Sequence, residues 1–211
     1  MSRGAESASA KASHEGPPAA VEIPLFPLNT VLFPGGPLPL RIFERRYVDM
    51  VRHCMREEVP FGVVLIRAGA EAGAVSSVAD IGTSARIVDF NAMPDGLLGI
   101  MCVGERKFRV TERRVQGDGL NLGTVLWADA EPAVPLPSEF SHLALLLRKV
   151  LPELGDIYQS ISRHFDDAGW VAARLAEILP INLAEKQHCL ELEDPVARLE
   201  RLSPFIRRAE D

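Results

Sequence analysis

The sequence predicts an α+β protein in which a β-rich N-terminal lobe with one inserted helix is followed by a helical C-terminal lobe. Short apolar segments interrupted by proline and glycine dominate residues 21–130, as expected of strands joined by turns. From residue 138 onward, apolar residues recur at i, i+3, i+4 and i+7, which is the spacing of helices that bury one face. Apolar residues make up 47% of the 211 residues, which excludes a chain that is disordered throughout.

The first twenty residues differ from the rest because they are rich in Ala, Ser, Gly and Pro. Such a segment has too few large apolar side chains to pack, so residues 1–20 are predicted to form a disordered tail. They lack the apolar stretch of a signal peptide, and no later segment approaches the roughly 20 apolar residues of a membrane span. Three widely spaced cysteines do not indicate a disulfide framework. We therefore expect a cytoplasmic protein that does not bind membranes.

The strands predicted in residues 21–130 form two groups on either side of one helix. The first group is punctuated by prolines, which lack an N–H donor, so it is predicted to supply edge strands or strand ends: Ile23–Phe26, Thr30–Phe33 and Leu38–Ile42. The helix is predicted over Glu44–Glu58, because apolar residues recur there at helical spacing and Pro60 follows. The second group comprises Phe61–Ile66, Ile81–Phe90, Leu97–Val103, Lys107–Arg114 and Leu122–Ala128. A series of short strands of this kind predicts a compact barrel or a folded sheet.

The C-terminal part is predicted to be a helical lobe, residues 138–211, joined by a linker. Residues 131–137 contain three prolines and form the predicted linker. An apolar stripe predicts a helix over Leu143–Leu151, and four-residue spacing extends helical character through Ile157, Ile161 and Phe165. Three more helices are predicted from periodicity and capping residues: Trp170–Leu179, one that begins near Asn182, and one that begins at Asp194-Pro195.

One segment carries a family resemblance. The run IPLFPLNTVLFPGGPLPLRIFE, from Ile23 to Glu44, resembles the opening of the N-terminal domain of Lon proteases, and Arg46-Tyr47 extends it as in small stand-alone members. Four later segments also resemble that domain: Ile81–Ile87, Pro94–Gly96, Gly104–Val110 and Leu179–Glu191. The resemblance spans about residues 21–208, and so many prolines at fixed spacing make the first motif specific.

The resemblance implies a fold and a role. The implied fold is a PUA-like β-barrel or twisted sheet lobe over residues 21–130, followed by the helical lobe. The implied role is recognition of protein substrates, with a contribution to assembly. The sequence has no G-x-x-x-x-G-K-[ST] motif, so no ATPase is expected, and no downstream protease domain is expected either.

We therefore expect a non-enzymatic interaction module with no catalytic residue, metal or cofactor. Its predicted partner is a polypeptide or protein, including unfolded segments, bound through exposed apolar patches or an open sheet edge. The predicted binding residues, which follow from the resemblance, are Arg41, Glu44, Arg46 and Tyr47. The oligomeric state stays open.

Two alternative functions have some support in the sequence. Basic clusters at residues 41–56 and 106–114, together with the PUA-like resemblance, fit an RNA-binding module. Acidic residues interleave with both clusters, and the net charge of −6 argues against nucleic acid. Ser160, His164 and Asp167 have the residue types of a hydrolase, but side chains on one helix do not make chained catalytic contacts. They are interpreted as surface residues, and two His-Cys pairs, His53-Cys54 and His188-Cys189, as core or surface rather than zinc ligands.

Overall fold

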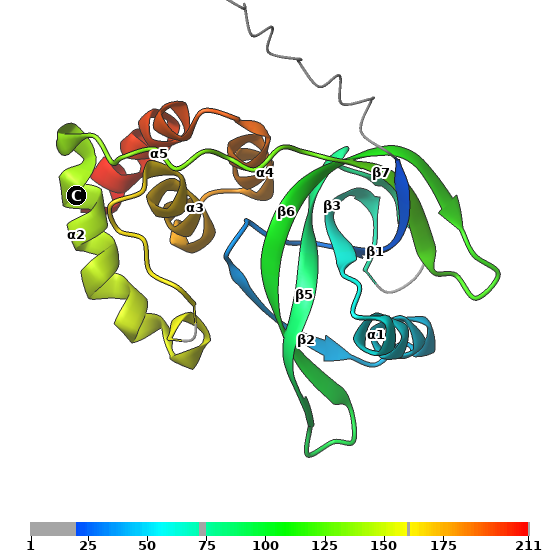
Figure 1. Ribbon diagram of the computed structural model, residues 1–211. Helices are drawn as coiled ribbons and strands as arrows, with labels where there is room; N and C mark the ends of the chain where they lie inside the picture. The colour runs from blue at the N-terminus through cyan, green and yellow to red at the C-terminus, as the bar shows by residue number, and fades with distance from the viewer. Residues whose placement is uncertain (1–19, 72–74, 160, 211) are drawn as a thin grey trace, which may run out of the picture.

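The computed structural model describes residues 20–71, 75–159 and 161–210 (Figure 1). The predicted tail, residues 1–20, lies outside these ranges except for its last residue. Seven strands fall within them: β1 (Val21–Leu28), β2 (Pro37–Ile42), β3 (Phe61–Gly69), β4 (Val75–Val78), β5 (Ile81–Ala92), β6 (Leu98–Val115) and β7 (Asn121–Trp127). The helices of the same ranges are α1 (Arg45–Glu57), α2 (Ser141–Val150), α3 (Ala168–Ile178), α4 (Leu183–Glu191) and α5 (Pro195–Glu210), with 3₁₀ turns η1 (Ser138–Phe140), η2 (Leu151–Leu154) and η3 (Asp156–Tyr158). The predicted α+β class is confirmed.

The strands form a sheet whose pairings return to their starting point. The order is β1-β7-β6-β5-β3-β4, and β1 also pairs with β3, so five strands complete a ring of pairings. The β1–β3 pairing is parallel, and the other pairings in the sheet are antiparallel. Strand β6 pairs with β5 along much of its length and with β2 and β7 at opposite ends. This β-rich lobe, with α1 packed on it, stands beside the helical lobe formed by α2 to α5 (Figure 1).

The prolines of β1 and β2 both lie where a sheet tolerates a residue without an N–H donor, but for different reasons. Strand β2 pairs with β6 alone among the described strands, and it carries Pro37 and Pro39. Strand β1 has neighbours on both sides, although the sequence predicted an edge strand or a strand end. Its pairing with β7 covers residues 21–25 and its pairing with β3 covers residues 25–28. Pro24 and Pro27 therefore each lie in a stretch that has a partner on one side only, where a missing N–H is tolerated.

Three of the predicted strands differ in the structure. The segments predicted as Leu97–Val103 and Lys107–Arg114 are one continuous strand, β6, in which a register shift against β5 takes the place of a turn. Thr30–Phe33 is not a strand. The buried Thr83 hydroxyl donates to the Leu32 carbonyl over 2.6 Å, so that carbonyl bonds to a side chain instead of a strand partner.

The predicted extension of the first C-terminal helix is wrong. Helix α2 ends at Val150, and the chain continues through two 3₁₀ turns into an irregular segment before α3. Pro152 lacks an N–H, and Gly155 has a φ of 86°, which is outside the helical range. The apolar spacing of Ile157, Ile161 and Phe165 instead reflects packing of this segment against the helical core. Helices α3 and α4 begin at the capping residues Asp167 and Asn182, whose side chains accept backbone N–H bonds.

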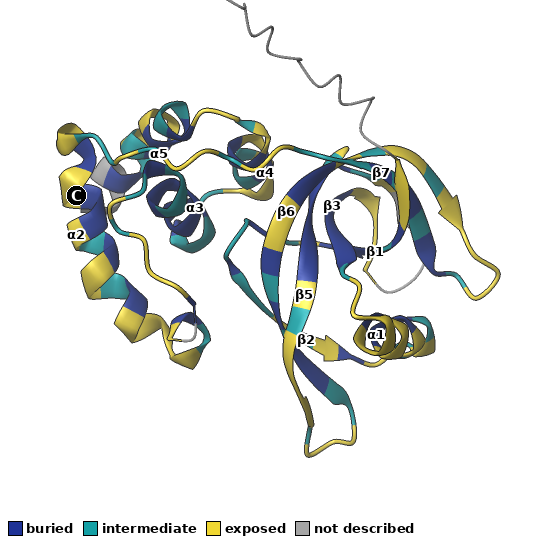
Figure 2. Ribbon diagram, in the orientation of Figure 1, coloured by how far each residue is buried: buried dark blue, intermediate teal, exposed yellow. Residues whose placement is uncertain are grey.

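The two lobes share one hydrophobic core. Its larger part lies among the helices, yet it includes four buried residues from the β-rich lobe: Val31, Phe33, Leu65 and Ala79. A second cluster lies under α1, where Tyr47, Met50, Val51 and Cys54 are buried against the sheet. Figure 2 shows buried stretches in β5 and β6 of the β-rich lobe and in α3 of the helical lobe. No helix of the described residues is long and apolar enough to cross a membrane.

Glycines allow the Pro34-Gly35-Gly36 loop to approach both β6 and α3 closely. The N–H of Gly35 donates to the Gly104 carbonyl over 2.7 Å, and the N–H of Gly104 donates to the Gly36 carbonyl over 2.9 Å. A methyl group on Gly104 would lie 2.3 Å from the Phe33 carbonyl oxygen, and one on Gly36 would lie 2.0 Å from a Glu177 carboxylate oxygen. Only glycine leaves enough space at these two positions.

Gly104→Ala is expected to lower the free energy of unfolding by about 1–3 kcal/mol, because backbone rather than a flexible side chain must move to admit the methyl group. Gly117→Ala is the matched control, since a Cβ there meets nothing within 4 Å. We expect it to change the free energy of unfolding by less than about 0.5 kcal/mol. Urea denaturation followed by circular dichroism measures both. Equal stability of the two variants would contradict the close approach at Gly104.

Candidate binding groove between the two lobes

The four residues predicted to bind a partner lie around the start of α1. Arg41, on β2, is exposed and forms an ion pair with Asp95 in the β5–β6 turn. Glu44 precedes α1 and pairs with Arg46, with 2.8 Å between a carboxylate oxygen and a guanidinium nitrogen. Arg46 also donates to the Gly119 carbonyl over 2.7 Å. Three of the four residues are therefore near one another, and Arg41 is the most accessible.

Tyr47 and Arg46 hold α1 against the sheet. The Tyr47 side chain is buried and its ring stacks on Phe26 with 3.9 Å between centroids. The Arg46 guanidinium lies 4.7 Å from the Tyr47 ring centroid while it binds the β6–β7 turn at Gly119. Because Tyr47 is buried, a partner cannot contact its ring without displacing α1. The structure thus gives Glu44, Arg46 and Tyr47 internal contacts.

A groove that the sequence analysis did not identify runs between the lobes. Its first part has a volume of about 590 Å³, within the range of ligand sites. One wall is the outer surface of β5 and β6, which supplies Val88, Met101 and Val103. The other wall is the segment before α3, with Ile157 and Ile161. Apolar side chains thus face each other across the boundary between the lobes.

The second part of the groove has a volume of about 610 Å³ and adjoins the first. Both parts are lined by His164 and Trp170 on the helical side, and by neighbouring residues Pro34 and Gly35 on the β side. The second part is otherwise lined by the linker, residues 131–135, by other residues of α3 and of the segment before it, and by Arg198 of α5. The groove therefore extends from the outer face of the sheet, past His164 and Trp170, to the linker.

Hydrogen bonds fix the linker and the segment before α3 to each other. The Asp167 carboxylate accepts the N–H of Trp170 over 2.7 Å and the N–H of Val134 over 3.0 Å. The Ala168 N–H donates to the Val134 carbonyl over 2.8 Å. The Trp170 ring packs edge-on against Phe165, with 4.9 Å between centroids. These contacts hold the linker and the start of α3 together beside the groove.

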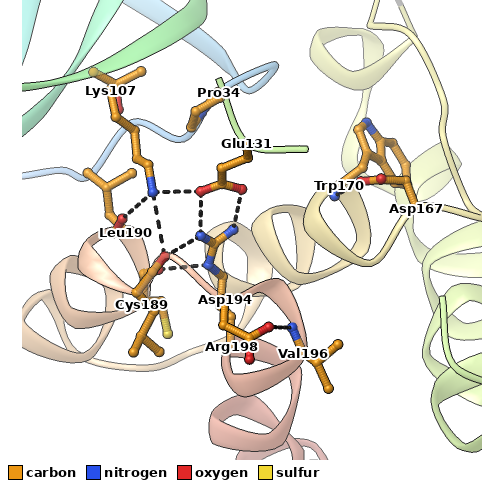
Figure 3. Close-up of polar contacts among 12 residues, drawn as sticks. Pro34, Lys107, Glu131, Asp167, Trp170, Cys189, Leu190, Asp194, Val196 and Arg198 are labelled. Atoms are coloured by element: carbon orange, nitrogen blue, oxygen red, sulfur yellow. Dashed lines mark hydrogen bonds and ion pairs between the residues drawn. The ribbon is translucent and has the colours of Figure 1, made fainter. Parts of the chain in front are cut away.

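A buried ion cluster joins the lobes beside the groove (Figure 3). The Glu131 carboxylate lies 2.6 Å from the Lys107 ammonium of β6 and 2.7 Å from the Arg198 guanidinium of α5. The side chains of Lys107 and Arg198 are only 8% and 2% exposed. Both cations also donate to α4: Arg198 to the Cys189 carbonyl over 2.8 Å, and Lys107 to the Leu190 carbonyl over 3.2 Å. Burial raises the pKa of Glu131, but the two cations outweigh burial, so its pKa lies below the ordinary value.

A second polar contact joins the Pro34 loop to α3. The fully buried Arg174 donates to the Pro34 carbonyl over 3.0 Å and to the Glu177 carboxylate over 2.6 Å. The Tyr158 hydroxyl donates to the Glu177 carboxylate over 3.3 Å, and the Lys186 ammonium donates to the backbone carbonyl of Glu177 over 2.7 Å. Burial dominates the environment of this carboxyl group and raises the pKa of Glu177 to about 7, despite the nearby Arg174.

The hydrolase and metal alternatives gain no geometric support. Ser160 lies outside the described residues. His164 and Asp167 lie in the irregular segment before α3, not on one helix face, and the Asp167 carboxylate caps α3. Within the ranges that the structure describes, no group of three or more His, Cys, Asp or Glu residues is placed to hold a metal ion.

The fold and the groove together define a two-lobe α+β binding domain. Residues 22–208 match the family model described as the ATP-dependent protease La (LON) substrate-binding domain. Since the match covers most of the chain, the chain belongs to this family, as the motif resemblance predicts.

Solved structures of related proteins agree with this assignment. A Lon N-terminal domain protein from Xanthomonas campestris is 39% identical, with a TM-score of 0.73 over 87% of this chain and 98% of that one. The N-terminal domain of a Mycobacterium avium complex Lon protease is 17% identical, with a TM-score of 0.60 over 88% and 97% of the two chains, and supports the fold alone.

Curated relatives are longer than this chain. The Lon protease of Anaeromyxobacter dehalogenans is 26% identical over 98% of this chain and 26% of its own length. The Lon protease of Escherichia coli K12 is 27% identical over 88% of this chain and 24% of its own length. The chain therefore spans about a quarter of the length of these relatives.

Glu131→Gln is expected to lower the free energy of unfolding by about 3 kcal/mol, because it leaves two buried cations without their anion. Glu185→Gln is the matched control. Both glutamate side chains are 24% exposed, but Arg201, the partner of Glu185, is 46% exposed. Water solvates Arg201 once its partner is neutral, so we expect little change. Urea denaturation at pH 7 compares the two, and a control that is equally destabilised would contradict the role assigned to cation burial.

Glu177 is expected to make stability depend on pH near neutrality. Its pKa is raised from 4.5 to about 7 on folding, so its contribution is complete below pH 4.5 and is lost as pH rises through 7. The side chain that Glu177→Gln introduces is neutral at every pH. The free energy of unfolding of this variant, relative to that of the unchanged protein, should therefore increase from pH 5 to pH 8. Urea midpoints at several pH values test this, with the exposed Glu193→Gln as the control for loss of one charge. A difference between Glu177→Gln and the unchanged protein that is constant with pH would contradict it.

Proposed function

We propose that this chain is a non-enzymatic module that binds polypeptide segments in the groove between its lobes. The observation that carries the proposal is the apolar groove itself, found in a member of a family of substrate-binding domains. Assistance to a protease is part of the same proposal, since the curated relatives are Lon proteases.

The groove has the form that an extended polypeptide requires. It is open along its length, and its lining comes from both lobes and from the linker. Its apolar residues include both aliphatic side chains and Trp170, so segments of different sequence can bury apolar area there. Such recognition does not enclose a single side chain in a fitted pocket, so dissociation constants of about 1 µM or weaker are expected.

The predicted binding residues have separate parts in this proposal. Arg41 is proposed as a contact for a partner, because its side chain is 57% exposed. Glu44, Arg46 and Tyr47 are proposed to act through the position of α1, to which their contacts belong. Cytoplasmic location is proposed from the cysteines, which are free and buried at positions 54, 102 and 189.

RNA binding is the alternative that the same experiments test. Several arginines of the two basic clusters form ion pairs: Arg46 with Glu44, Arg52 with Asp49, Arg56 with Glu57, and Arg114 with Glu22. A phosphate backbone would have to replace these carboxylates. If RNA were the ligand, affinity would fall steeply with salt, since phosphate contacts release counterions.

Binding can be tested with a labelled ten-residue peptide of leucine and valine spaced by glutamine. Fluorescence anisotropy should detect a dissociation constant in the range of about 1–100 µM. Val88→Ser is expected to weaken binding about fivefold, because Val88 lines the groove and is 43% exposed without a ligand.

The control for this variant is Val115→Ser, which removes the same methyl groups from an exposed valine at the far end of β6. We expect it to leave the affinity for the peptide unchanged. No binding at about 100 µM, or equal weakening by both variants, would contradict the proposal. Single-stranded RNA in the same assay, at two salt concentrations, tests the alternative.

A further inference from the structure

The charges along the groove are not balanced. Eight ionisable side chains, one of them the imidazole of His164, line the groove, and they do not contribute equally because several already have partners within the chain. Arg86 pairs with Glu105, with 2.6 Å between the guanidinium and the carboxylate. Arg198 pairs with Glu131, and the Asp167 carboxylate accepts two backbone N–H groups. The charges of Arg86 and Arg198 are therefore compensated, while the Asp167 carboxylate is partly buried and held at the start of α3.

Three exposed carboxylates remain: Asp89, Asp156 and Asp166. Among the residues that the structure describes, the Asp89 side chain accepts a hydrogen bond only from the N–H of Phe90 over 2.8 Å, and the Asp156 side chain only from the side-chain amide of Gln159 over 2.7 Å. Neutral donors do not cancel a negative charge. Asp166 contributes its backbone carbonyl to Leu136 and makes no ion pair with another described residue.

The three carboxylates are distributed along the groove instead of being gathered at one point. Asp89 belongs to β5 on the sheet side of the first part, and Asp156 belongs to η3 on the helical side. Asp166 lines the second part, beyond His164 and Trp170. Both parts are also lined by apolar residues, so a bound segment would meet carboxylates as well as apolar surface in each part.

We propose that the groove selects polypeptide segments in which lysine or arginine is interspersed among apolar residues. This inference rests on the proposed function. The apolar side chains bury area against Val88, Met101 and Trp170. A lysine or arginine stem lies along apolar surface while its charged head reaches a carboxylate. An acidic segment meets like charge at three points and is rejected.

Three peptides of equal length and apolar content test the selection: the glutamine-spaced peptide, and versions with lysine or glutamate at the same positions. At low salt the lysine peptide is expected to bind about tenfold more tightly than the glutamine peptide, as three exposed ion pairs predict. The glutamate peptide should bind more weakly than both. The lysine advantage should shrink in about 0.5 M NaCl, where the screening length falls below about 5 Å.

The triple variant Asp89→Asn, Asp156→Asn, Asp166→Asn assigns the effect to the groove. It should bring the affinity for the lysine peptide to within about twofold of that for the glutamine peptide, whose own affinity stays the same. The control is Glu112→Gln, Glu139→Gln, Glu200→Gln, which changes the net charge equally at exposed positions outside the groove. The control should keep the lysine advantage.

The outcomes separate this inference from the proposed function. If the glutamine and lysine peptides bind the unchanged protein equally well, the selection is wrong and the proposed function stands. If the control variant loses the lysine advantage as fully as the aspartate variant, overall charge and not the groove is responsible, and the inference is overturned. If no peptide binds, the proposed function itself fails.

Discussion

The arrangement of the two lobes depends on one carboxylate. Glu131 lies between a lysine of the longest strand and an arginine of the last helix, and both cations continue to carbonyl groups at the end of α4. Charges buried in this way are costly unless each has a partner, so the cluster forms only when strand, linker and helices are all in place. It therefore favours one arrangement of the lobes over others, and the groove beside it exists only in that arrangement. Burial of the shared hydrophobic core stabilises the contact between the lobes, and the ion cluster determines how the lobes are oriented relative to each other.

Much of the fold could be predicted because its signals are local. The α1 helix follows from apolar spacing, and the starts of α4 and α5 follow from Asn182 and Asp194-Pro195. The third helix was predicted from Trp170 onward, whereas α3 begins at Ala168 after its cap. The errors occurred where a distant contact decides the structure. Leu97–Val103 and Lys107–Arg114 merge into one strand because β5 pairs with both. Thr30–Phe33 forms no strand, since Thr83 takes one of its carbonyls. The spacing of Ile157, Ile161 and Phe165 correctly indicated that these side chains pack on the core. It wrongly indicated a helix, because the positive φ of Gly155 ends the helical conformation before them.

The candidate site was harder to predict than the fold. The family motif led to Arg41, Glu44, Arg46 and Tyr47, which are adjacent in sequence and could be read as one unit. The groove instead assembles side chains from β5, β6, the Pro34 loop, the linker and the segment before α3. No spacing in the sequence relates Val88 to Trp170. The sequence held one weak signal for the groove. His164 and Trp170 flank a polar segment that packs near the proline-containing linker, but this indicates a binding surface only when the positions of the two lobes are known.

The prolines of β2 have a consequence for a protein that handles unfolded chains. An extended chain with free N–H and C=O groups readily joins an unpaired sheet edge, and such additions lead to aggregates. β2 pairs with β6 alone among the described strands, and two of its six residues are proline. Proline cannot donate to a ladder, so an arriving strand would find donors missing at alternate positions. Under the proposed function, apolar segments would be held by side chains of the groove, while the prolines keep β2 from serving as a template for sheet growth.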